Sequence, residues 1–234
     1  MQAVVLAGGK GARLKPYTTE IPKPLVPLGD KPVIEILLAG LKKHGANDVV
    51  ICVNHLAHLI SSVLEDGERF GLNIRYSLEK EPLSTVAPLK LIENLQDNFL
   101  VANGDILTDL DFNKLYQHHL ESEAGLTVAT HQRRHKVDYG VIGTGDDNRV
   151  VAFEEKPTAE FTVSMGIYVF SKRILDLVPD GAPFGFDDLM YLLLEKNEPV
   201  GTFPFDGYWM DIGRPDDYEQ AKEDIKSNPD LLAP

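Results

Sequence analysis

The residues best suited to chemistry stand near the start of the chain, in the segment LAGGKGARLK over residues 6–15. A short apolar run, Ala3 to Leu6, leads into three glycines and then into Arg13 and Lys15. Glycines have no Cβ, so backbone N–H groups can approach phosphate oxygens closely, and the bases add positive charge. A tight turn alone needs one or two glycines and no flanking bases. We therefore expect this loop to bind a phosphate group.

Two common phosphate loops do not match this segment. A Walker A loop needs Gly-Lys-Ser/Thr, whereas Gly11 is followed by Ala12 and Arg13. The dinucleotide fingerprint G-x-G-x-x-G fails because Leu14 stands where the third glycine packs a helix on a strand. Prolines follow, and each disfavours helix in the residue before it. Lys23 lies between two of them, on a stiff backbone that could hold it against a phosphate.

The elements that must position this loop alternate in type over the first half of the chain. The predicted strands are Ala3 to Leu6, Val49 to Val53, Ile74 to Ser77 and Phe99 to Ala102. The predicted helices are Val33 to His44, Leu56 to Leu64 and Ala87 to Leu95. This alternation is typical of an α/β fold with a mostly parallel sheet flanked by helices on both faces.

Strands dominate the chain after about residue 124. They are predicted at Leu126 to His131, Tyr139 to Gly143, Val150 to Glu154, Thr162 to Phe170 and Gly201 to Phe205, with a short apolar stretch at Tyr208 to Ile212. Two further helices are predicted at Phe186 to Lys196 and Pro215 to Lys226. No linker separates the halves, so we expect a mixed sheet in one domain over residues 1–234.

Composition excludes several classes of protein. The 234 residues are 43% hydrophobic and 25% charged, with no apolar run long enough to span a membrane and no signal peptide. The net charge of −13 disfavours nucleic acid as a partner. The single cysteine, Cys52, lies among β-branched residues and is expected to be an inert core thiol in a cytoplasmic protein.

The motifs as a set resemble a known family, the sugar-1-phosphate nucleotidyltransferases. They are LAGGxGxRLxP from residue 6, PKPxxP from residue 22, NGD from residue 103, EEKP from residue 154, GIYVF from residue 166 and GYWxDIGxPxDY from residue 207. The resemblance spans roughly residues 1 to 225. It implies a Rossmann-like, three-layer α/β/α nucleotidyltransferase fold, with a nucleotide-binding half over 1–123, a sugar-phosphate-binding half over 124–234 and no C-terminal β-helix domain.

The resemblance implies that a sugar 1-phosphate attacks the α-phosphorus of an NTP and releases pyrophosphate. A sugar phosphate is largely dianionic at neutral pH, so positioning and charge neutralisation matter more than a general base. By family position, Arg13 would hold the leaving β- and γ-phosphates and Lys23 would contact the α-phosphate. Asp105 and Asp211 would hold Mg²⁺, the expected cofactor.

The resemblance also assigns binding residues by position. The expected nucleotide-binding residues are Leu6, Ala7, Gly8, Gly9, Gly11, Glu79, Pro82, Ser84, Thr85 and Gly104. The expected sugar-phosphate-binding residues are Gly140, Glu155, Lys156 and Ser164. The expected partners are an NTP and a sugar 1-phosphate, with a homo-oligomer as a further family expectation.

The segment EKEPLSTVAPL from Glu79 resembles the base-reading loop of mannose-1-phosphate guanylyltransferase-like short forms. Guanine presents adjacent N–H donors that suit a carboxylate, whereas uracil suits an amide. GTP with a mannose- or heptose-type sugar is therefore favoured, and a uridylyl- or thymidylyltransferase is the alternative. At two positions where the family has glycine, this chain has Ser84 and Ala87. A relative that binds its ligands without catalysing the reaction is therefore a further alternative.

Other patterns point elsewhere. Asp109-Leu110-Asp111 matches the metal-binding Asp-x-Asp motif of many glycosyltransferases, but we interpret it as a turn and helix start before Phe112. His55 and His58 have helical spacing without a third ligand. His118 and His119 are predicted to lie on the surface.

Overall fold

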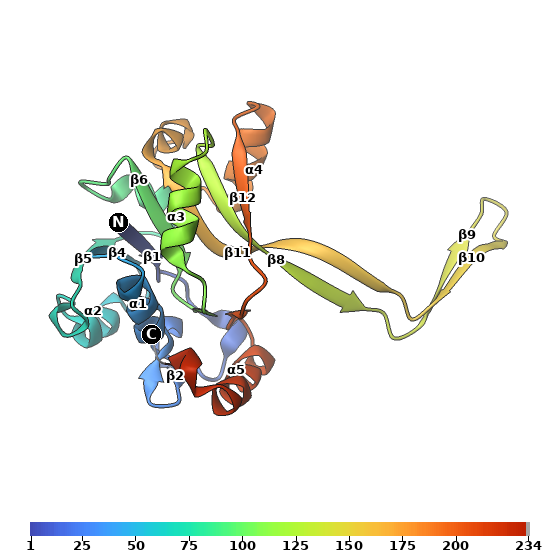
Figure 1. Cartoon of the computed structure of the whole chain (residues 1–234), viewed down its shortest axis with the longest axis horizontal. Helices are drawn as coiled ribbons and strands as arrows, with labels where there is room; N and C mark the ends of the chain where they lie inside the picture. Colours follow the sequence, from blue (N-terminus) through green and yellow to red (C-terminus); the bar gives the residue numbers. More distant parts are fainter. Residues whose placement is uncertain (233–234) are drawn as a thin grey trace.

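A seven-stranded mixed sheet forms the centre of the protein. In the computed structural model, which describes residues 1–232, the strand order is β12-β8-β11-β6-β1-β4-β5 (Figure 1). The strands are β1 (Gln2–Leu6), β4 (Asp48–Val53), β5 (Asn73–Leu78), β6 (Asn98–Asn103), β8 (Leu126–Lys136), β11 (Thr158–Ser171) and β12 (Val200–Pro204). The domain predicted from the sequence ends at Pro234, and its last two residues lie outside the described residues.

The sheet is parallel on one side and mixed on the other. β1 pairs in parallel with β4 and β6, and β4 pairs in parallel with β5. β11 is antiparallel to both β6 and β8, and β12 is parallel to β8. The predicted parallel core with a mixed extension is confirmed. The chain moves from β1 to β4 and β5 on one side and returns to β6 on the other, which makes a topological switch point at β1.

Successive side chains of β1 point to opposite faces of the sheet, and each face packs against its own layer of helices. Ala3 and Val5 pack with α1 (Val33–Lys43), α2 (Ala57–Leu64) and α3 (Phe112–Leu120). Val4 packs on the other face with α4 (Phe186–Glu195) and the short 3₁₀ segment Ala87–Leu91. These three layers match the predicted α/β/α arrangement.

A third cluster of buried side chains ties the chain's ends together. Leu14, in the glycine-rich loop, packs with Tyr218 and Ile225 of α5 (Pro215–Ser227). The Tyr218 hydroxyl donates to the carbonyl of Pro27 at 2.7 Å, next to the small β2–β3 hairpin. The strands of that hairpin are β2 (Pro27–Leu28) and β3 (Lys31–Pro32). The C-terminal helix therefore braces the loop that carries Arg13.

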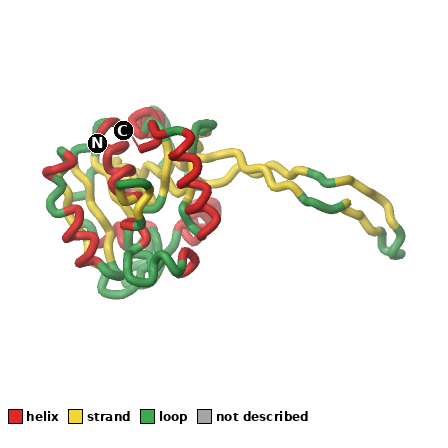
Figure 2. Tube along the Cα trace, turned by 90° about the horizontal axis from the view of Figure 1, so that it is seen from below, coloured by secondary structure: helices red, strands yellow, loops and turns green. Residues whose placement is uncertain are grey.

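A long arm leaves the sheet on one side (Figures 1 and 2). We define it as residues 132–163: the outer parts of β8 and β11 and the hairpin of β9 (Gly140–Thr144) and β10 (Val150–Glu155). β8 is buried from Leu126 to Thr130 and exposed or half-buried beyond. No side chain of the arm is buried. The sequence predicted these strands but not that they leave the body.

The helices differ from the predictions in one place. A helix was expected over Ala87 to Leu95, but only the 3₁₀ turn Ala87–Leu91 forms. Ile92 is extended and Asn94 has a φ of +58°, so the backbone cannot continue as a helix. The apolar side chains of this segment are still buried in the core, although no α-helix forms there. They are Ala87, Leu89, Ile92 and Leu95. Within residues 1–232, no helix combines the length and the apolarity needed to cross a bilayer.

The prediction that His119 lies on the surface is wrong. Its ring is only 2% exposed, and it contacts the Thr127 hydroxyl at 2.8 Å and the Ser171 hydroxyl at 3.1 Å. Burial lowers the pKa of His119, so the neutral ring is favoured. Cys52, another buried titratable side chain, behaves as predicted. Burial raises its pKa to about 12, which keeps the thiol protonated and unreactive.

Candidate active site

A cavity of about 480 Å³ opens at the carboxyl ends of β1 and β6. This is the switch point of the sheet, where open α/β folds bind ligands. The cavity is lined by Leu6, Ala7, Gly8, Gly9, Lys10, Gly11, Ala12, Arg13, Lys23, Pro24, Glu79, Pro82, Ser84, Thr85, Asn103, Asp105 and Gly213. Of the predicted nucleotide-binding residues, all but Gly104 line it. Gly104 lies directly beneath, where its N–H donates to the Leu6 carbonyl at 2.9 Å.

Glycines are required where the loop turns. Gly11 has a φ of +61°, and a Cβ there would lie 3.0 Å from Thr18. A Cβ on Gly8 would lie 2.8 Å from the carboxylate of Glu79. The Thr18 hydroxyl donates to the Gly11 carbonyl at 2.7 Å and fixes the turn. The loop is therefore held open toward the cavity, with its backbone accessible.

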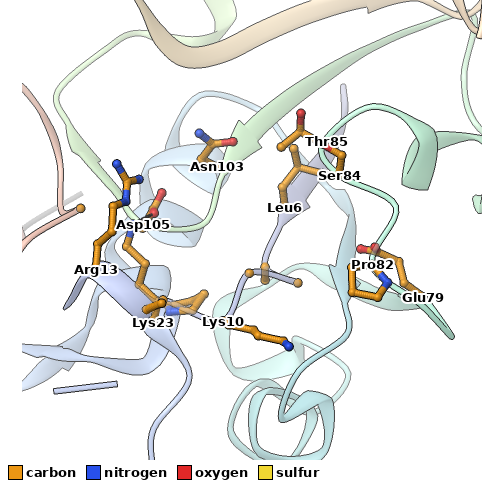
Figure 3. Close-up of a pocket in the computed structure, with 17 residues that line it drawn as sticks. Leu6, Lys10, Arg13, Lys23, Glu79, Pro82, Ser84, Thr85, Asn103 and Asp105 are labelled. Atoms are coloured by element: carbon orange, nitrogen blue, oxygen red, sulfur yellow. Dashed lines mark hydrogen bonds and ion pairs between the residues drawn. The ribbon is translucent and has the colours of Figure 1, made fainter. Parts of the chain in front are cut away.

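Arg13, Lys23 and Asp105 gather on one side of the cavity (Figure 3). The Lys23 ammonium forms an ion pair with Asp105 and lies 3.6 Å from Asp211. Arg13 is exposed, and its charge acts on Asp211. Two cations and Asp105 therefore line this end of the cavity, and Asp211 lies next to Lys23 outside the lining. Such a group of charges can bind a triphosphate and neutralise its charge.

Strand pairing brings the two carboxylates together. Asp105 follows β6, and Asp211 lies at the end of β13 (Trp209–Asp211). β13 pairs antiparallel with β7 (Ile106–Thr108), with Asp211 opposite Ile106. The Ile212 N–H then donates to the Asp105 carbonyl at 3.1 Å. The two aspartates are thus neighbours across a short ladder, although one lies in each half of the chain.

One oxygen of each carboxylate has no hydrogen-bond partner. Oδ1 of Asp105 and Oδ1 of Asp211 are buried and accept no hydrogen bond, although the Asp211 oxygen lies 3.6 Å from the Lys23 ammonium. Burial raises the pKa of Asp211, and the charge of Asp105 raises it further, while Lys23 and Arg13 act in the opposite direction. The described residues contain no cluster of three or more Asp, Glu, His or Cys side chains that could hold a metal. A pair of carboxylates suits Mg²⁺, which keeps water and substrate oxygens as its other ligands.

The opposite side of the cavity carries Glu79 and Pro82 (Figure 3). Glu79 is only 7% exposed, and its Oε2 accepts a hydrogen bond from the Leu83 N–H at 3.1 Å. Burial raises the pKa of this carboxyl. The Thr85 hydroxyl accepts from the Phe186 N–H at 2.9 Å, which joins the loop to α4. A preformed polar wall therefore lies across the cavity from the two cations.

The predicted sugar-phosphate residues do not all lie near this cavity. Gly140, Glu155 and Lys156 are exposed on the arm, outside the cavity lining. Ser164 lies at the base of the arm, and its hydroxyl contacts the Tyr168 hydroxyl at 3.2 Å. Burial raises the pKa of Tyr168 to about 12, and the nearby charge of Asp211 adds a smaller rise. The structure thus leaves Ser164 beside the site and separates the other three from it.

Comparison with known proteins identifies the family. The family model described as nucleotidyl transferase matches residues 2–228. The chain belongs to the nucleotidyl transferase family. It is 36% identical to the UTP–glucose-1-phosphate uridylyltransferase of Synechocystis sp., over 97% of this chain and 64% of that protein. It is 35% identical to the mannose-1-phosphate guanyltransferase of Yarrowia lipolytica, over 100% of this chain and 68% of that protein. The chain thus spans about two thirds of the length of these relatives.

A solved structure has the same architecture. HddC from Yersinia pseudotuberculosis, crystallised in complex with GMP-PN, superimposes with a TM-score of 0.73 at 28% sequence identity. The match covers 96% of this chain and 99% of HddC. The family resemblance inferred from the motifs is therefore correct, and so is the predicted fold.

Several residues of the site lay within the motifs but were not predicted to function. Asn103, Lys10 and Gly213 line the cavity. Asn103 ends β6 two residues before Asp105, and Lys10 lies inside the glycine-rich loop, so position in a motif could have identified both. Asp109 and Asp111, the glycosyltransferase alternative, have structural partners. Asp109 accepts from the Tyr208 N–H at 2.7 Å, and Asp111 caps α3.

Ser84 adopts a backbone conformation that favours glycine, with a φ of +70°. Ser84→Gly is expected to change the free energy of unfolding by less than about 1 kcal/mol, because relief of left-handed strain offsets the added freedom of the unfolded chain. Ser84→Val should lower it by about 2 kcal/mol, since a β-branched side chain at positive φ is strained. Urea denaturation measures both. A valine variant as stable as wild type would contradict the conformation of this loop.

Proposed function

We propose that the protein transfers a nucleotidyl group from an NTP to a sugar 1-phosphate. A phosphate oxygen of the sugar attacks the α-phosphorus, and the bond from that phosphorus to the β-phosphate oxygen breaks. The products are an NDP-sugar and pyrophosphate. The observation that carries the proposal is the cavity lined by the glycine-rich loop, two cations and Asp105, with Asp211 next to Lys23. The guanylyl- and uridylyltransferase relatives support it.

Arg13 and Lys23 are assigned to the triphosphate. The Arg13 guanidinium is exposed at the cavity and can offer paired N–H donors to the β- and γ-phosphates, where negative charge accumulates as pyrophosphate leaves. Lys23 is assigned to the α-phosphate and the incoming phosphate. Its ammonium lies beside the carboxylates of Asp105 and Asp211, so it is already positioned where we propose that these phosphates bind.

Asp105 and Asp211 are assigned to a divalent cation. Their buried, unsatisfied Oδ1 atoms fit this role, and both lie at the phosphate end of the cavity. When bound, Mg²⁺ would neutralise phosphate charge and polarise the α-phosphoryl group. The two aspartates also hold Lys23 in place, so the carboxylate pair orients a cation of the protein as well. Dependence on Mg²⁺ is part of this proposal.

Four residues are assigned to the sugar 1-phosphate. Lys156 would contact its phosphate and Glu155 a sugar hydroxyl, with Gly140 and Ser164 lining the subsite. Ser164 lies at the base of the arm, in contact with Tyr168, and the other three lie farther out on the arm.

The nucleobase is assigned to the side of the cavity that holds Glu79, with GTP favoured. Glu79→Gln is expected to lower the ratio of kcat/KM for GTP to that for UTP by about tenfold, because an amide replaces a carboxylate acceptor facing two N–H donors. Steady-state kinetics with both nucleotides measure it. Glu81→Gln, a change of the same chemistry at an exposed position, is the control. Unchanged selectivity would remove Glu79 from base recognition.

The proposed function is tested with a substrate panel. Purified protein is incubated with Mg²⁺, each of the four common NTPs or dTTP, and glucose, mannose, heptose and amino-sugar 1-phosphates. Pyrophosphate release and NDP-sugar formation are both recorded. We expect both products in equal amounts with at least one pair of substrates. Nucleotide binding without any product across the panel would favour a catalytically silent relative.

A further inference from the structure

The arm carries Glu155 and Lys156, two proposed sugar-phosphate-binding residues, at a position from which they do not reach the cavity of their own chain. β8 and β11 pair continuously from Ser164 opposite Thr130 to Thr158 opposite Lys136. The ladder closes with the Val137 N–H donating to the Pro157 carbonyl at 2.9 Å. At about 3.3 Å per residue, this ribbon holds Lys156 more than about 20 Å from the base of the arm. The proposed sugar-phosphate cation therefore lies far from the cavity of its own chain.

One face of the β9–β10 hairpin combines this chemistry with apolar side chains. Glu155 is opposite Gly140, and Phe153 is opposite Ile142. A Cβ on Gly140 would lie 2.6 Å from the Phe153 ring and 3.0 Å from the Glu155 carboxylate, so the glycine makes room for both. Phe153 and Ile142 are 64% and 56% exposed. A surface that received Glu155 would also cover these apolar groups.

The arm as a whole has the properties of an interface. Half of the exposed large hydrophobic side chains among the described residues lie on it: Tyr139, Val141, Ile142, Val150, Val151, Phe153 and Phe161. An isolated two-stranded ribbon is marginally stable in water, and exposed apolar patches mark interaction sites. A stable interface uses about 20–30 residues a side, which an arm over residues 132–163 can supply.

The partner that binds the arm is inferred from the two proposed sugar-phosphate-binding residues that the cavity lacks. The proposed triphosphate cations and Asp105 line the cavity and Asp211 lies beside Lys23, but Glu155 and Lys156 are not in the lining. A second copy of this chain carries both residues on an extended arm, with Glu155 on the same face as the exposed apolar side chains Phe153 and Ile142. A two-fold exchange supplies each body with one arm and leaves no arm unpaired. A partner of another kind would leave the sugar end of both sites incomplete.

We propose that two copies of this chain exchange arms, so that Glu155 and Lys156 of one copy complete the sugar-phosphate subsite of the other. The inference rests on the proposed function, because it states where the sugar-phosphate residues act. Each active site then contains Arg13, Lys23, Asp105 and Asp211 from one chain and the arm residues from its partner. A monomer would hold the nucleotide and lack half of the second substrate's site.

Two mixed dimers test the exchange. In the first, one chain carries Arg13→Ala and the other Lys156→Ala, and the mixed species is isolated with two affinity tags after co-expression. Exchange gives one site with neither substitution, so about half of the wild-type activity is expected. In the second, both substitutions lie on one chain and its partner is wild type. Exchange damages both sites, so little activity is expected. A chain that uses its own arm gives the reverse pattern, which would overturn the inference.

The assembly itself gives a readout that needs no activity. Wild-type protein at micromolar concentration is expected to sediment as a dimer. Phe153→Asp with Ile142→Asp is expected to give a monomer that still unfolds cooperatively, and Asp147→Ala at the turn of the hairpin is the control. A wild-type monomer that forms NDP-sugar would overturn the inference and leave the proposed function intact. If the wild-type protein is a dimer that the Asp substitutions dissociate, but that wild-type dimer forms no product with any substrate pair, the proposed function is overturned instead.

Discussion

Asp105→Asn is expected to lower kcat by about 10²- to 10³-fold, because it removes one of two negative charges from the proposed metal site. The amide is nearly isosteric, and the backbone contacts around residue 105 do not use its side chain. The fold should therefore remain cooperative. The Mg²⁺ concentration that gives half-maximal rate should rise as well. Steady-state kinetics over a Mg²⁺ titration measure both effects.

The control for this variant is Asp176→Asn, which changes an exposed carboxylate away from the cavity. It should leave kcat and the Mg²⁺ dependence unchanged. If Asp105→Asn turned over substrate at a rate close to wild type, the divalent cation would have to bind elsewhere. Loss of cooperative unfolding in Asp105→Asn would instead show that the carboxylate's ion pair with Lys23 is mainly structural.

Arg13→Ala is expected to lower kcat/KM by about 30-fold or more, equivalent to about 2 kcal/mol of transition-state stabilisation. The reason is that the guanidinium is assigned to the leaving pyrophosphate, where charge develops. Arg13→Lys should recover only part of this loss, because an ammonium cannot reproduce the planar pair of donors. Inhibition by added pyrophosphate should weaken in parallel. Initial rates in the forward direction, with and without pyrophosphate, test the assignment.

Lys15→Ala is the matched control for Arg13. Lys15 is an exposed base in the same loop, but it does not line the cavity. Its removal should leave kcat/KM within about twofold of wild type, as expected for a surface charge. Equal losses in the two variants would mean that the loop acts only through its overall positive charge. Full activity of Arg13→Ala would remove Arg13 from the mechanism.

Local signals made the nucleotide half of the site predictable. β1, the glycine turn and Gly104 are close in sequence to the residues that they position, and each has a distinctive residue type. The alternation of strands and helices likewise determined the parallel part of the sheet. Asp211 was assigned through the family motif alone. Its approach to Asp105 depends on the pairing of β7 with β13, which no local pattern specifies.

The wrong prediction for His119 and the unpredicted projection of the arm have a common physical cause. Whether His119 is buried depends on Thr127 and Ser171, which reach it from β8 and β11. Whether β9 and β10 pack on the body depends on the path of a ribbon whose residues are compatible with either arrangement. Such outcomes are decided by tertiary contacts, and alternating apolar residues predict only that a strand forms.

The packing of α5 against the glycine-rich loop has a consequence for biosynthesis. Leu14 is completely buried in a cluster that includes Tyr218 and Ile225, close to the end of the chain. A chain still being translated would have built its strands and the phosphate loop long before this helix left the ribosome. The loop would lack its support until α5 had emerged, so nucleotide affinity should develop only after translation has passed Ser227.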